Sequence, residues 1–259
     1  MTTDNVCMQQ REWLKTDFSE YDASQTGRNQ GDSQPVEYKQ PEKVIRIISL
    51  PSPEDVTVCK PHIRQCINDR RSIRHYDNDA MTLEQLSFML WATQGVTGKR
   101  GGLTLRTVPC SGASHSFETY LFVLNVGELE AGVYQYLPQH HSLAFISKSS
   151  NISEQVDVLT LNQPFVPHFA KRAGVLFAWS TIPERSEWKF GITAHKKILL
   201  DAGHICQNLY LAAESLNLGA CAIGIYDQQL IDNLIQVDGI NEFVIYLASV
   251  GIKRREKAL

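Results

Sequence analysis

The 259-residue chain lacks several features that would place it in a common class of proteins. No apolar run approaches the roughly 20 residues that a membrane-spanning helix needs, so we expect no membrane partner. The start at Met1 and Thr2 lacks the basic and apolar regions of a secretory signal peptide. The net charge of −3 leaves no excess of cations to neutralise a phosphate backbone, so we expect no nucleic-acid partner.

Closely spaced cysteine pairs are also missing. The six cysteines are scattered along the chain, and no two of them form a C-x-x-C pattern. With 43% hydrophobic and 20% charged residues, a chain of this length can bury a core without disulfide bonds. The composition predicts a globular protein with reduced thiols, and we expect it in the cytoplasm.

The histidines and serines show neither the spacing of a metal site nor that of a hydrolase. His140 and His141 are adjacent, and neighbouring residues on a strand point to opposite faces. His204 and Cys206 are two residues apart on a predicted helix, so they cannot face one ion together. No G-x-S-x-G motif marks a nucleophile. The sequence therefore favours neither a metal site nor nucleophilic hydrolysis.

The chain divides into a polar arm over residues 1–42 and one domain over residues 43–259. The arm is rich in Gln, Asp, Ser and Gly, and we interpret it as an extended lead-in rather than a second domain. In the domain, apolar and β-branched runs predict strands over 44–50, 118–126, 132–137, 173–179, 220–225 and 242–251.

Two helices have clear signals. Thr82 and Gln85 form a capping-box pattern, and the helix that they open is predicted to stop at Gly95. Apolar residues recur at intervals of three and four over 194–218, with Gly219 as the expected C-terminal stop. Helices and strands without a strict βαβ rhythm predict an α+β fold: a mixed, mainly antiparallel sheet flanked by helices, with the long helix central.

Four segments carry residues that suit an anion or a planar ligand. Residues 70–74 hold three arginines and a serine, and guanidinium groups match phosphate oxygens in pairs. Pro109 and Gly112 shape a tight loop before a strand. Gly224 stands at a strand end and allows close approach to the backbone. Residues 253–255 form a basic chain end. Each segment alone also fits a plain structural reading, such as a solvated surface or a packing glycine.

Together, these segments resemble the FMN-dependent nitroreductase superfamily, most closely its azoline dehydrogenase branch, which oxidises rings in thiazole- and oxazole-modified peptides. The resemblance runs from about Leu50 to the C-terminus. It is carried by the phrases RRSIRHYDNDAMTLEQLSFMLWATQG, LRTVPCSGASHSFETYLFVLNV, GVYQYLPQHHSL and LLDAGHICQNLYLAAESLNLGACAIGIYD. It implies FMN as the cofactor, a homodimer with FMN in the subunit interface, a small-molecule substrate, and NAD(P)H as a candidate electron donor.

The resemblance also implies which residues contact FMN. Arg74 would lie near the pyrimidine edge of the flavin, where a cation stabilises the reduced ring. The phosphate and ribityl chain would be held by residues from both basic segments, namely Arg70, Ser72 and Lys253 or Arg255, with Arg71 as a further candidate from the same cluster. The isoalloxazine would be contacted by Pro109, Cys110, Ser111, Gly112, Gln163, Ile223 and Gly224.

The chain departs from the azoline-oxidising branch at one catalytic position. In that branch a Lys-Tyr pair precedes the long helix and is thought to serve in proton removal. Here the pair reads Lys189-Phe190, and Phe190 has no phenol to exchange a proton. Lys189 remains the catalytic candidate.

The sequence thus predicts an FMN-dependent oxidoreductase that passes two electrons between flavin and a small organic substrate, such as a nitro, quinone or enone acceptor. Two alternatives stay open. One is a flavin-dependent dehydrogenase of peptide-derived rings. The other is a non-catalytic family member that acts as a binding subunit.

Overall fold

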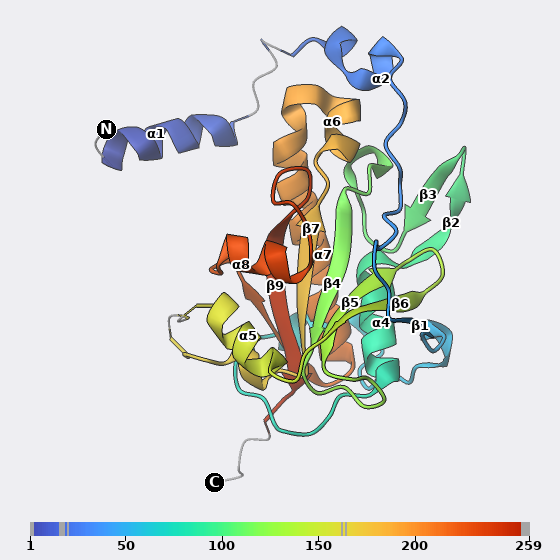
Figure 1. The fold of residues 1–259 in the computed structure, drawn as a ribbon, viewed down its shortest axis with the longest axis vertical. Coiled ribbons are helices and arrows are strands. Elements are labelled where there is room, and N and C mark those ends of the chain that lie inside the picture. Colours follow the sequence, from blue (N-terminus) through green and yellow to red (C-terminus); the bar gives the residue numbers. More distant parts are fainter. Residues whose placement is uncertain (1–2, 16–18, 20, 162, 164, 255–259) are drawn as a thin grey trace.

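A seven-stranded antiparallel sheet forms the centre of the computed structural model, which describes residues 3–15, 19, 21–161, 163 and 165–254 (Figure 1). Its strands are β1 (Arg46–Ser49), β4 (Phe117–Val123), β5 (Gly132–Leu137), β6 (Ser142–Lys148), β7 (Val175–Thr181), β8 (Leu218–Ile223) and β9 (Phe243–Ile252). They lie in the order β1-β6-β5-β4-β7-β9-β8, and every paired neighbour is antiparallel. A separate hairpin of β2 (Val96–Arg100) and β3 (Leu103–Arg106) projects from the body (Figure 1).

The helices of the described residues are α1 (Thr3–Leu14), α2 (Gly27–Gln30), α3 (Ile63–Asp69), α4 (Leu83–Gln94), α5 (Ile152–Leu159), α6 (Glu184–Phe190), α7 (Ala194–Ser215) and α8 (Gln228–Leu234). Short 3₁₀ turns lie at Ala23–Gln25, Pro53–Asp55, Ser111–Ala113, Ala170–Arg172 and Gly191–Thr193. Across the described part of the chain, no helix combines the length and the apolar character needed to cross a membrane.

Two helical layers cover the two faces of the sheet because strand side chains alternate in direction. On β7, Phe177 and Trp179 join the core under α4 and α7, whereas Leu176 and Ala178 join the core under α5 and α8. Both faces of β7 are therefore buried, as its continuous apolar sequence predicts. The predicted α+β fold is confirmed, and two isolated parallel bridges, including Ser72 with Ala220, supply its mixed component.

The predicted elements are present, with shifted ends. Each of the six predicted strands forms, and no end moves by more than three residues. The capping box of α4 is confirmed, since the Gln85 N–H donates to the Thr82 hydroxyl at 3.2 Å and the Thr82 N–H donates to the Gln85 side chain at 3.0 Å.

The prediction that α7 continues to residue 218 with Gly219 as its stop is wrong. The helix ends at Ser215, and Asn217, with φ of 59°, takes the left-handed position that follows a helix. Gly219 instead lies inside β8, where a Cβ atom would approach the Ile73 side chain to 2.6 Å. The glycine therefore allows the arginine-rich segment to pack directly on β8.

The N-terminal arm is more structured than an extended lead-in, because it contains α1 and α2. Its later part is also packed into the domain. The Lys39 ammonium pairs with the buried Glu242 at 2.5 Å and donates to the Tyr120 hydroxyl at 3.1 Å, and the Lys39 N–H donates to Glu118 at 3.2 Å. The division at residue 42 stays a prediction, although these contacts tie residue 39 to the sheet.

Replacing Lys39 with methionine is expected to lower the free energy of unfolding by about 2–3 kcal/mol, somewhat less than the cost of breaking a fully buried ion pair. The variant leaves the Glu242 carboxylate buried without its cation. Urea unfolding measures the change, with Lys43→Met, an exposed lysine just after the arm, as the control. Equal destabilisation by both variants would show that the Lys39 contacts contribute nothing.

Candidate functional site

The arginine-rich segment runs alongside β8. Ser72 forms a parallel bridge with Ala220, and the Ile73 N–H donates to the Ala220 carbonyl at 2.9 Å. Side chains alternate along an extended segment. With Ile73 packed on Gly219, the side chains of Ser72 and Arg74 point the other way.

Arg70, Ser72 and Arg74 gather around two aromatic rings. The Arg70 guanidinium lies 5.3 Å from the ring centre of Tyr210 on α7, and the Tyr210 and Ser72 hydroxyls are 3.0 Å apart. The Arg74 guanidinium lies 5.8 Å from the ring centre of Phe169. No carboxylate of a described residue forms an ion pair with Arg70 or Arg74. Two half-buried positive charges therefore stand without a local counter-ion, which favours an anionic ligand.

The surface beyond the C-terminal end of β8 is open, at Gly224. Ser72 lies beside Ala220, so the parallel segments carry Arg74 toward residues 222–224. Gly224 is exposed, and a Cβ atom added to it would meet no heavy atom within 4 Å. The buried Gln163 side chain donates to the carbonyl of Ile225 at 2.7 Å. The structure thus brings Arg74, Gln163, Ile223 and Gly224 to one end of the sheet, beside a surface that a planar ligand can approach.

The other basic candidates are placed differently. The Lys253 ammonium pairs at 2.6 Å with Glu214, a buried carboxylate that Lys60 also contacts at 2.5 Å. The Arg71 guanidinium donates to the carbonyls of Asn68 and Arg70 at 2.9 and 2.7 Å. Arg255 lies outside the described residues. Contacts of Lys253, Arg71 and Arg255 with a phosphate stay predictions.

The loop at Pro109–Gly112 is anchored on α7 by Asp201. The Ser111 N–H and hydroxyl donate to its carboxylate at 2.9 and 3.0 Å, and the Cys110 thiol donates at 3.4 Å. Asp201 was missed by sequence reasoning, although a signal was present. It is an acid within the repeating apolar face of α7, between Ile198 and Ile205, and such a residue needs a buried partner.

Within one chain, the Pro109–Gly112 loop and the group formed by Arg70, Ser72 and Arg74 (the arginine group) contact different parts of α7. The loop contacts α7 at Asp201, and the arginine group contacts α7 at Tyr210. A separation of nine residues corresponds to about 14 Å along a helix axis. A ligand that touches both groups of one chain would have to span about this distance.

The Lys189 ammonium is held by the same loop. It donates to the carbonyls of Gly112 and Ala113 at 2.7 and 3.2 Å, and burial lowers the pKa of Lys189. The adjacent Phe190 ring packs on Gly112, where a Cβ atom would come within 2.6 Å of it. A lowered pKa is the direction that a proton-transfer role requires. The catalytic role of Lys189 nevertheless stays a prediction.

His115, three residues after the Pro109–Gly112 loop, gives the stability of the fold a specific pH dependence. Burial, reinforced by the charge of Arg106, lowers the pKa of His115 from 6.5 to about 4. Between these two pH values the unfolded chain binds a proton at His115 and the folded chain does not. The free energy of unfolding therefore falls as the pH drops from about 6.5 to about 4, by up to about 3 kcal/mol. Urea unfolding across this pH range should show that the free energy of unfolding of His115→Gln depends less steeply on pH than that of wild type. An unchanged slope would contradict the neutral, buried state of His115.

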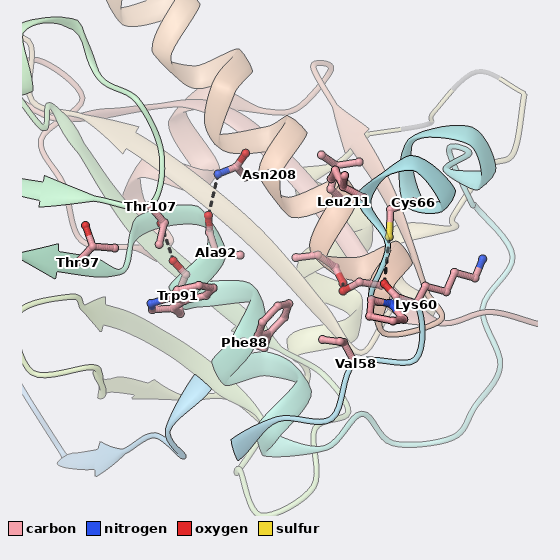
Figure 2. Close-up of a pocket in the computed structure, with 14 residues that line it drawn as sticks. Val58, Lys60, Cys66, Phe88, Trp91, Ala92, Thr97, Thr107, Asn208 and Leu211 are labelled. Atoms are coloured by element: carbon pink, nitrogen blue, oxygen red, sulfur yellow. Dashed lines mark hydrogen bonds between the residues drawn. The ribbon is translucent and has the colours of Figure 1, made fainter. Parts of the chain in front are cut away.

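A cavity of about 460 Å³ lies between α3, α4 and α7 (Figure 2). Phe88 and Trp91 line it, and Asn208 and Thr107 donate their hydrogen bonds to backbone carbonyls of α4. None of its lining residues is a predicted flavin contact. Nor do three His, Cys, Asp or Glu side chains come together to hold a metal ion in the described ranges.

Comparison with known proteins identifies a matching family and similar sequences. Residues 67–252 match the model of the nitroreductase family. A Methanocaldococcus jannaschii protein named as a nitroreductase is 31% identical over 206 residues, which cover 80% of this chain and 96% of that protein. The trifolitoxin-processing protein of Rhizobium leguminosarum is 28% identical over 139 residues. That match covers 51% of this chain but only 36% of the relative, and it supports the resemblance to the azoline dehydrogenase branch.

Solved structures share the fold at lower identity. A protein of Ralstonia eutropha, named as a nitroreductase, superposes with a TM-score of 0.66 at 23% identity, over 86% of this chain and 98% of that chain. A chain of the Escherichia coli microcin synthetase complex, solved with a truncated pro-peptide, gives a TM-score of 0.61 at 15% identity, over 98% and 95%. The family match covers well over half of this sequence, so the chain belongs to the nitroreductase family.

Proposed function

We propose that the chain is an FMN-dependent oxidoreductase that passes two electrons between the flavin and a small organic substrate. Membership of the nitroreductase family supports an oxidoreductase. One observation supports a phosphate-bearing cofactor: the guanidiniums of Arg70 and Arg74 have no counter-ion among the described residues, and the segment of Arg74 runs toward the open space beside Gly224. The resemblance to the family selects FMN among such cofactors. A phosphate and a planar ring would supply the missing partners.

In this proposal, different residues of the arginine group bind different parts of FMN. Arg70 and Ser72 hold the phosphate and ribityl chain, and Arg74 places a cation near the pyrimidine edge of the ring. Ile223 and Gly224, at the end of β8, would offer backbone N–H groups to the ring. Bound FMN would supply the two-electron chemistry. The protein's part is to hold the ring, to stabilise its negative charge when reduced, and to limit the access of water.

We further propose a homodimer in which the Pro109–Gly112 loop of one copy contacts the flavin held by the arginine group of the other, since within one chain the two groups contact α7 nine residues apart. The exposed face of α7 offers a surface for the second copy. Leu199 and Leu200 are 45% and 56% exposed, and an added Cβ at Gly203 would meet no atom within 4 Å. Exposed leucines beside a glycine suit close packing against another helix.

The peptide-directed alternative is favoured by one comparison. A relative that processes trifolitoxin matches half of this chain, which supports a substrate derived from a peptide. The Phe190 side chain cannot replace the tyrosine of the azoline-oxidising branch in moving a proton. For this reason we place reduction of a small acceptor first.

Anaerobic reduction of the FMN-loaded protein tests the proposed reaction. NADH or NADPH should bleach the flavin absorbance, and a nitro or quinone acceptor should restore it with turnover. Bleaching without recovery by these acceptors would shift the assignment toward ring dehydrogenation. A protein that binds FMN but exchanges electrons with neither donor nor acceptor would favour the non-catalytic binding subunit.

A further inference from the structure

One buried carboxylate organises the loop that the proposed function places on the flavin ring. Asp201 is only 4% exposed, and it lies within α7, the longest of the described helices. Its two oxygens accept from the Ser111 N–H, the Ser111 hydroxyl and the Cys110 thiol. His204, one turn along α7, lies 3.7 Å from the same carboxylate. A rigid helix thus presents one acceptor group to two consecutive loop residues.

The backbone of this loop needs such an anchor. Gly112, Ala113 and His115 have φ of 57°, 50° and 48°, a left-handed conformation that residues other than glycine disfavour. Strained backbone of this kind persists where surrounding contacts over-determine it. Lys189 holds the carbonyls of Gly112 and Ala113 from α6, and Arg185 donates to the His115 carbonyl at 3.0 Å. Asp201 supplies the matching contacts at the start of the loop, from the opposite helix.

We propose that Asp201 is a positioning residue, which fixes Cys110 and Ser111 in the conformation in which the loop meets the flavin of the partner copy. It acts through the loop rather than on the flavin. This inference rests on the proposed function for its effect on the reaction, whereas the anchoring contacts can be tested without flavin.

The test compares Asp201→Asn with wild type in two assays. The first is the rate of alkylation of Cys110 by iodoacetamide at pH 8, followed by mass spectrometry of the Cys110 peptide. Burial and the Asp201 carboxylate raise the pKa of Cys110 to about 11, so wild type should react slowly. The asparagine removes the charge and one acceptor. The rate should rise about tenfold, which corresponds to a pKa lower by about one unit.

The second assay uses the FMN-loaded dimer. We expect the Kd for FMN to stay within about threefold of the wild-type value, because the arginine group is unchanged. Flavin reduction should slow by about tenfold or more, because the loop would no longer be held in position against the ring. Glu154→Gln, an exposed acid on α5, is the charge-matched control and should change neither assay. A thermal melt checks folding of each variant.

The two assays distinguish the anchoring of the loop by Asp201 from the effect of that anchor on flavin reduction. Unchanged alkylation of Cys110 in Asp201→Asn would overturn the anchoring role, whether or not the protein binds FMN. Faster alkylation with an unchanged reduction rate would overturn the positioning role while leaving the proposed function intact. Absence of FMN binding by wild type would instead overturn the proposed function. If Asp201→Asn does not fold, Asp201→Ser takes its place, because it also removes the charge and the paired carboxylate oxygens, and an unchanged Cys110 rate there would also contradict the anchor.

Discussion

Replacing Arg74 with alanine is expected to slow flavin reduction by roughly 10- to 150-fold, since a hydrogen bond to a charged group contributes about 1.5–3 kcal/mol. The Arg74 guanidinium rests on Phe169 without a carboxylate partner among the described residues. Its charge is therefore available to stabilise the anionic, reduced ring. Stopped-flow reduction by NAD(P)H measures the rate, and a redox titration measures the accompanying fall in flavin potential.

Two further variants make the Arg74 experiment specific. Arg74→Lys keeps the charge and loses the planar fork, so it should recover part of the rate and of the potential. Arg64→Ala removes an exposed arginine of α3 and should match wild type. If Arg74→Ala kept the wild-type potential and rate, Arg74 would have no electrostatic role toward the flavin.

Replacing Leu200 with glutamate is expected to break the homodimer and to release FMN with it. An uncompensated charge buried in an interface costs about 3–5 kcal/mol, which weakens association by about two to four powers of ten. Leu200 is more than half exposed on α7, next to Gly203. Sedimentation velocity measures the dissociation constant, and fluorescence titration measures FMN affinity in the same samples.

Val158→Glu is the matched control for Leu200→Glu. Val158 is 63% exposed on α5, which packs in the other helical layer. Its substitution should leave both association and FMN affinity unchanged. A Leu200→Glu protein that still dimerises like wild type would place the subunit interface elsewhere. A monomer that retains full FMN affinity would show that one chain completes the site alone.

Sequence reasoning was most reliable where one local signal dominates. The capping box at Thr82 and the apolar run of β7 each depend on neighbouring residues, and both are confirmed. The hairpin of β2 and β3 was not predicted, although Gly101-Gly102 between two β-rich segments is a strong turn signal. Both glycines have positive φ, at 57° and 80°, as such a turn requires.

The end of α7 shows why tertiary contacts limit such predictions. Gly219 looks like a helix stop when only its neighbours in sequence are considered. Its actual role is set by Ile73, which is far away in the sequence and packs on it across β8. The α1 helix was missed for another reason: its sequence is mostly polar, and its exposed Val6, Trp13 and Leu14 form only a sparse stripe.

For the candidate site, residue types were easier to predict than their partners. The structure brings Arg70, Ser72 and Arg74 together along β8, where the sequence showed only a dense basic run. It also gives Lys253 a buried partner, Glu214, that spacing could not reveal. Asp201 contacts residues about 90 positions away, and no local pattern encodes a contact of that range.

Release and identification of the bound cofactor is the most direct measurement. The purified protein, before any addition, is scanned for flavin absorbance, denatured, and its supernatant analysed by chromatography and mass spectrometry. The arrangement of Arg70, Ser72, Arg74 and Gly224 predicts intact FMN, near one per chain, in the native protein. A colourless protein that also fails to bind added FMN would contradict the flavin site and leave a non-catalytic binding subunit as the better interpretation.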